Sequence, residues 1–112
     1  MAVWQAGFRT LQYFYMHERT WGGGYEPVGQ ARVDYNMARC GEISYSIDAA
    51  YRCNGYGTRM LGLLEEMEEI KKKTDRLCAV VKITNTASQR CFEKLGYLKS
   101  FKEDMVYYVK DI

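Results

Sequence analysis

A chain of 112 residues that is 47% hydrophobic and 14% aromatic can bury one ordinary core, which predicts a single domain over residues 1–112. Its 16 basic and 14 acidic residues give a formal net charge of +2, and this weak, dispersed charge argues against nucleic acid as a partner. No apolar run approaches the roughly 18 residues that a membrane-spanning helix needs, so no membrane partner is expected either.

The first half of the chain has the pattern of strands separated by turns. Residues 8–18 are rich in aromatic side chains and predict a strand, whereas residues 21–25 contain three consecutive glycines and predict a flexible turn. Residues 28–35 predict the returning strand. In residues 42–47 apolar and polar side chains alternate with a period of two, which predicts a strand with one buried face.

From Gly55 onward the hydrophobic pattern takes a helical period. Apolar side chains recur three or four residues apart, and charged side chains occupy the other faces. The recurring apolar residues are Met60, Leu63, Leu64, Met67 and Ile70. They predict one amphipathic helix of about four turns. The lysines at residues 71–73 close it and suit the negative end of its dipole.

The rest of the chain predicts a further strand, a second helix and a hairpin. Residues 77–83 read as a buried strand, and a helix is expected over residues 86–95. Thr86 and Gln89 have the spacing of a capping box, and Gly96 suits the C-terminal cap. Two strands are expected around residues 102–104. This order of elements indicates an α/β layer with a mixed sheet.

The join between the strand at 42–47 and the first helix carries the pattern R-x-x-G-x-G, formed by Arg52, Gly55 and Gly57. Glycines let a ligand approach the backbone, and the first amides of a helix are free donors that favour an anion such as pyrophosphate. Glycines before a helix also serve tight turns or close packing, so both interpretations stay open. The third glycine of a dinucleotide fingerprint and the Gly-Lys-Ser/Thr of a P-loop are not present.

Together with a second motif, this loop resembles the GNAT superfamily of N-acetyltransferases. The family has an acidic residue near a strand end, a Q/R-x-x-G-x-G/A loop, and a later N-x-x-S-x-x-x-Y/F-x-K-x-G-F/Y segment. The matching residues are Ser46 to Asp48, Arg52 to Gly57, and Asn85, Ser88, Phe92, Lys94, Gly96 and Tyr97. The resemblance implies an α/β fold with a GNAT-like mixed, mostly antiparallel sheet and two helices, lacking the family's usual first strand and two N-terminal helices.

The resemblance implies that the chain binds acetyl-CoA. The backbone of Tyr45, Ser46 and Ile47 would pair with the pantetheine arm. The residues that would hold the pyrophosphate are Arg52, Cys53, Asn54, Gly55, Tyr56, Gly57 and Thr58. Asn85 matches a family residue near the pantetheine or an ordered water, although a role as a helix N-cap would explain it equally well.

The resemblance also identifies a departure in the catalytic positions. Phe92 stands where many members carry a tyrosine general acid, and Val80 stands where a glutamate base is common. Glu42 is then the best base candidate, with Tyr45 and His17 as weaker alternatives. Phe92 is expected near the thioester sulfur, so that Phe92→Tyr would raise turnover modestly.

The acceptor implied is a primary amine on an amino sugar, another small molecule or a protein N-terminus. Residues 28–34 and 42–44 resemble members that acetylate amino groups of nucleotide-linked sugars, where Arg32 could meet a phosphate. The alternative is a non-catalytic acyl-CoA-binding module that acts as a sensor or assembly partner. A homodimer is expected to cover the apolar surface that the missing helices would leave.

Cysteine usage favours a reducing, cytoplasmic setting. Cys40, Cys53, Cys78 and Cys91 are widely spaced and form no CxxC pair. With His17 as the single histidine, they do not make the pattern of a metal site.

Overall fold

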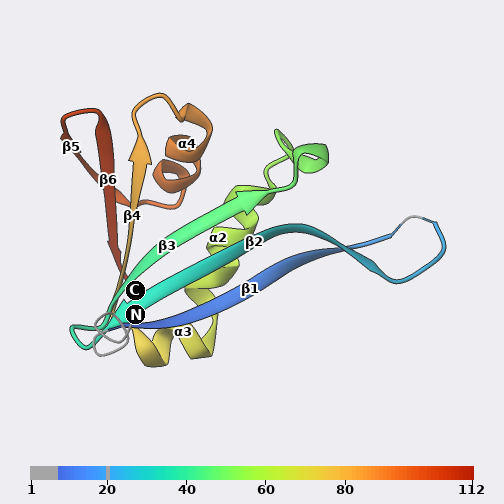
Figure 1. The fold of residues 1–112 in the computed structure, drawn as a ribbon, viewed down its shortest axis with the longest axis horizontal. Helices are drawn as coiled ribbons and strands as arrows, with labels where there is room; N and C mark the ends of the chain where they lie inside the picture. The colour runs from blue at the N-terminus through green and yellow to red at the C-terminus, as the bar shows by residue number, and fades with distance from the viewer. Residues whose placement is uncertain (1–7, 20) are drawn as a thin grey trace.

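The computed structural model describes residues 8–19 and 21–112, which form a six-stranded sheet with its helices against one face (Figure 1). The strands are β1 (Phe8–Glu18), β2 (Tyr25–Asn36), β3 (Cys40–Ile47), β4 (Arg76–Lys82), β5 (Leu98–Lys102) and β6 (Met105–Asp111). The helices are a 3-10 turn η1 (Ala49–Tyr51), α2 (Tyr56–Glu66), α3 (Glu68–Lys73) and α4 (Thr86–Lys94). The expected α/β class and the expected mixed sheet are confirmed.

The sheet has the order β1-β2-β3-β4-β6-β5, and its pairs are antiparallel except for β3 with β4. The long β1–β2 hairpin extends well beyond the other strands in Figure 1. Within the described residues no strand or helix precedes β1. Residues 1–7 lie outside the described part.

One face of the sheet packs on α2, α3 and α4, because the strands alternate apolar and polar side chains. Val33, Ile43 and Val106 from the strands are buried against Leu61 and Ile70 from the helices. The opposite face of β1, β2 and β3 is exposed. We call it the uncovered face, defined by Gln12, Phe14, Met16, Gln30, Arg32, Glu42, Ser44 and Ser46.

The prediction of one continuous first helix was wrong. Met67 adopts an extended conformation with φ −71° and ψ 129°, which ends α2 at Glu66 and starts α3 at Glu68. The bend keeps Ile70 fully buried, and the Tyr13 hydroxyl donates to Glu69 Oε1 at 2.6 Å, which fixes α3 beneath β1. Hydrophobic periodicity could not reveal this break, because the apolar side chains face the core on both sides of it.

The predicted capping box of the second helix was also wrong. Asn85 is the N-cap of α4, since its Oδ1 accepts from the Ser88 amide at 3.2 Å. Gln89 instead donates to the carbonyls of Lys82 at 3.3 Å and Ile83 at 2.9 Å and so ties α4 to the end of β4. Gly96 at the other end has φ 84°, which confirms its role as C-terminal cap.

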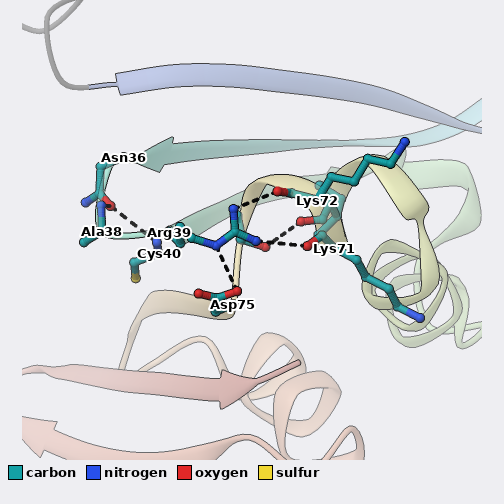
Figure 2. A network of polar contacts seen from close by, with 9 residues as sticks. Asn36, Ala38, Arg39, Cys40, Lys71, Lys72 and Asp75 are labelled. Atoms are coloured by element: carbon teal, nitrogen blue, oxygen red, sulfur yellow. Dashed lines mark hydrogen bonds and ion pairs between the residues drawn. The ribbon is translucent and has the colours of Figure 1, made fainter.

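An arginine joins the β2–β3 turn to the end of α3, as Figure 2 shows. Arg39 donates to the carbonyl oxygens of Lys72 at 2.8 Å and Lys71 at 3.2 Å, and its Nε lies 2.9 Å from an Asp75 carboxylate oxygen. These carbonyls end a helix and have no intrahelical donor. Arg39 therefore caps α3 and sets where β4 begins.

None of the helices in the described residues is both long and apolar enough to traverse a lipid bilayer.

Candidate functional site

The sheet divides into two halves between β3 and β4. These strands pair only through Cys40 with Arg76, Gly41 with Leu77, and Glu42 with Cys78. Beyond Glu42 they diverge (Figure 1), although residues 41–47 of β3 stay paired with β2 on the other side. Within the described chain, the edge of β3 from Ile43 to Ile47 therefore presents backbone groups without a strand partner. We call this segment the free edge of β3.

The loop after β3 holds a row of backbone amides. Asp48 caps η1 by accepting from the Ala50 amide at 3.0 Å, and Arg52 Nε donates to the Ile47 carbonyl at 3.1 Å. Asn54 donates to the carbonyls of Tyr51 and Arg52, so three side chains brace the turn from within. The described hydrogen bonds give no acceptor to the amides of residues 53–58. A turn that is braced in this way, followed by free amides at the start of a helix, favours the binding of an anion.

Both glycines of the loop have a reason within the fold. Gly55 has φ 79°, a conformation that side chains with a Cβ rarely adopt, and a Cβ there would meet open space. Gly57 packs closely on α4, because a Cβ on it would lie 3.2 Å from Cys91 Sγ. The turn and packing interpretation that the sequence left open is thus supported. Close approach of a ligand is not needed to explain either residue.

Tyr45 crosses from β3 to α4 on the helix side of the divergence. Its hydroxyl lies 2.8 Å from Ser88 Oγ, and its ring meets the Phe92 ring edge-on at 6.0 Å. Burial raises the Tyr45 pKa to about 12, partly opposed by the hydrogen bond with Ser88. Sequence reasoning gave Tyr45 backbone contacts and a weaker candidacy as a base, and it did not pair Tyr45 with Ser88, because nothing local links residues 43 positions apart.

Phe92 lies in the core, where its side chain is 1% exposed. Its ring stacks on Tyr108 at 5.2 Å and meets Tyr97 at 5.0 Å in an edge-on contact. The ring therefore belongs to an aromatic cluster of the core. Its expected place near the thioester sulfur stays a prediction.

The other candidate side chains are dispersed. Glu42 is exposed on the uncovered face, opposite to the side that Tyr45 faces, at the last β3–β4 pair before the divergence. Ser46 is also exposed there, whereas Ile47 is half-buried toward the helices. His17 lies on β1 and meets the Tyr56 ring edge-on at 5.8 Å, so it stands beside the loop and apart from Glu42. The N-cap role of Asn85 is observed, and its contact with a pantetheine stays a prediction.

The arrangement fits acetyl-CoA in two respects. A free strand edge can pair with the amides of an extended pantetheine, as an added strand would. The unbonded amides at the start of α2 follow that edge directly and suit the pyrophosphate. These are the backbone groups that the resemblance predicted, now placed next to one another.

A sequence model of the acetyltransferase (GNAT) family matches residues 2–97. The chain belongs to this family. No match was found among curated proteins.

Solved structures share the fold at low sequence identity. A domain from Methanocaldococcus jannaschii DSM 2661 has a TM-score of 0.79 and 17% identity, covering 99% of this chain and 72% of that one. A putative acetyltransferase from Salmonella typhimurium, solved with acetyl-CoA, has a TM-score of 0.68 and 19% identity over 76% of this chain and 58% of its own. The spermidine/spermine N-acetyltransferase of Vibrio cholerae has a TM-score of 0.72 and 11% identity over 91% of this chain and 66% of its own.

This chain thus spans 58% to 72% of the length of these structures.

Proposed function

We propose that this chain binds acetyl-CoA and transfers its acetyl group to a primary amine. The observation that carries the proposal is the continuity of two backbone features, the free edge of β3 and the unbonded amides of residues 53–58. Family membership supports acetyl-CoA as the donor. Acetyl-CoA supplies an activated acyl carbon, and the protein supplies position and charge stabilisation.

Each part of the site has a defined task in this proposal. The amides of residues 53–58 hold the pyrophosphate, and the free edge of β3 aligns the pantetheine arm. Glu42 stands at the last β3–β4 pair on the uncovered face and accepts the proton that the attacking amine loses, directly or through water. Carboxylates are among the side chains that act as general bases in such proton transfers.

The uncovered face is the side from which an amine would approach. It carries Glu42, Ser44 and Ser46 on β3 and Arg32 on β2, opposite Ser44 in register. Arg32 Nε lies 3.2 Å from Asp34 Oδ2, so a phosphate of a nucleotide-linked amino sugar would compete with that carboxylate for it. This favours a small amine or a peptide N-terminus over a nucleotide-linked sugar.

The alternative function is that of an acyl-CoA-binding module without catalysis. Phe92 and Val80 at the usual acid and base positions are the observations that favour it. Both functions need the loop, but only an enzyme acetylates an amine. Acetyl-CoA binding measured by calorimetry, and mass spectrometry of a panel containing a polyamine, an aminoglycoside, an amino sugar nucleotide and a short peptide, would distinguish them.

A substitution in the first turn of α2 tests the binding site without disturbing the core. Thr58→Asp places a carboxylate where the pyrophosphate should bind, yet an acidic residue in a first helical turn stabilises the helix. We expect affinity for acetyl-CoA to fall about tenfold or more, since like charges a few ångströms apart near a surface repel by about 1–4 kcal/mol. Thr58→Asn is the matched neutral control and should bind nearly as the wild type does.

Equal affinities of the two Thr58 variants would place the pyrophosphate elsewhere. Tight binding with no acetylated product from any amine would favour the binding module.

A further inference from the structure

Amine acetylation releases a thiolate, and the residue at the position of the family's usual acid cannot help it leave. Phe92 has no proton to share and is buried among aromatic rings. If the proposed function holds, charge that develops on the sulfur needs another donor. Such donors are worth most when they are fixed in a partly buried site.

A phenol borders the proposed path of the pantetheine arm. Tyr45 lies on the free edge of β3, three residues beyond the last pair with β4, and its side chain faces the helices. Its hydroxyl reaches Ser88, one helical turn before Phe92 on α4. The contact therefore spans the divergence between the sheet halves on the helix side, opposite to Glu42.

We propose that the Tyr45 hydroxyl, held by Ser88, donates the hydrogen bond that stabilises the departing thiolate. In this proposal Ser88 donates its hydroxyl hydrogen to the Tyr45 oxygen, and the phenol hydrogen turns from the Cys91 thiol to the departing sulfur. The new C–N bond forms as the C–S bond breaks, and the electron pair of that bond stays on sulfur. The amine proton leaves to Glu42 or water, and the thiolate takes its final proton from water.

The surroundings of this pair suit the role. Ser88 lies in the first turn of α4, where the helix dipole favours negative charge nearby. Burial keeps the Tyr45 hydroxyl protonated at neutral pH, with a pKa of about 12, so its hydrogen is always present to be donated. The Cys91 thiol on α4 is a neighbouring titratable group, and its hydrogen bond with the phenol also raises the Tyr45 pKa.

The other tyrosines in contact with Phe92 are placed for structure. The Tyr108 hydroxyl donates to Glu93 Oε2 at 2.9 Å, and Tyr97 is buried next to Glu65. Tyr108 belongs to β6 and Tyr97 interacts with Glu65 of α2, so neither is part of β3. Tyr108→Phe is therefore a matched control, because it removes the same atom from a ring that touches the same phenylalanine.

The test is the single-turnover rate of acetyl transfer to the fastest amine of the panel, with acetyl-CoA affinity measured separately by calorimetry. Tyr45→Phe should lower the rate about ten- to a hundredfold and leave the affinity within about twofold, because the hydroxyl acts only as charge develops. Ser88→Ala should give a smaller loss of rate, and the double variant should be no slower than Tyr45→Phe alone. Tyr108→Phe should stay within about twofold of the wild-type rate.

A Tyr45→Phe protein that is folded, binds acetyl-CoA and transfers acetyl at the wild-type rate would overturn this inference and leave the proposed function intact. Additive losses in the double variant would also overturn it, since Ser88 would then act independently of Tyr45. A wild-type protein that acetylates no amine of the panel would overturn the proposed function and this inference with it.

Discussion

Phe92 shows how one residue can keep its motif position and change its task. In the family motif it aligns with a side chain that serves the leaving group, but here its ring joins Tyr45, Tyr97 and Tyr108 in one aromatic cluster. The ring therefore contributes to stability through burial and edge-on contacts. In the proposed function, a neighbouring side chain such as Tyr45 serves the leaving group instead.

A hydroxyl added to Phe92 should cost stability and bring no catalytic gain. Phe92→Tyr buries a hydroxyl among aromatic rings that provide no hydrogen-bond partner. Such an unsatisfied group typically lowers the free energy of unfolding by about 1–3 kcal/mol. Urea unfolding should show the loss, and turnover should not rise. Phe101→Tyr makes the same change at a side chain that is 61% exposed, and should lie within about 0.5 kcal/mol of wild type.

Unchanged stability together with faster turnover in Phe92→Tyr would restore the role that the motif implies for this position.

At the scale of elements, the packing of β3 against its neighbours leaves no room for one added methyl group. Gly41 is buried in the part of β3 that pairs with β4. A Cβ on it would lie 2.7 Å from Val33 Cγ1, 3.0 Å from Thr74 Cγ2 and 3.1 Å from Leu77 Cδ2. These neighbours come from β2, the end of α3 and β4, so the glycine allows these elements to meet closely.

Two glycine substitutions should therefore change the free energy of unfolding in opposite directions. Gly41→Ala should lower the free energy of unfolding by about 1–3 kcal/mol through overpacking. Gly62→Ala, inside α2, should raise it by about 0.5–1 kcal/mol, because the added Cβ meets only Leu95 Cδ2 at 3.5 Å and alanine favours helix. Chemical denaturation of both variants measures the difference, and a shift of the same sign in both would contradict this packing argument.

At the scale of the whole molecule, the uncovered face leaves apolar side chains in solvent. Phe14 is 64% exposed and Met16 is 46% exposed on β1, where Phe14 lies opposite Gln30 of β2. We propose that a second copy of the chain covers the β1 part of this face, around Phe14 and Met16, and leaves the β3 part with Glu42 open to the amine, in line with the homodimer expected from the sequence. Burial of such side chains stabilises association in proportion to the area removed from water.

Sedimentation at micromolar concentration should then report a dimer. Phe14→Lys should shift it toward monomer, because a buried ammonium without a partner is costly. Leu98→Lys, at a side chain that is 73% exposed on β5, is the control and should leave the dimer intact. A wild-type protein that sediments as a monomer and unfolds cooperatively would contradict this proposal.

The sequence by itself determined the order of elements, because strand and helix periods are local properties of the chain. It also identified the loop at Arg52, Gly55 and Gly57, since a motif depends on neighbours in sequence. The limits of β1 and the hairpin of β5 and β6 follow from alternation and turn residues. In these places local pattern and final structure agree.

Tertiary structure alone decided the break at Met67, the burial of Phe92 and the bond between Tyr45 and Ser88. It also decided that Cys40 and Cys78, far apart in sequence, place their sulfur atoms 3.6 Å from each other. Each of these depends on contacts between segments tens of residues apart. A side chain's partners are set by which faces meet across the sheet and helices, and no periodicity within one segment encodes that.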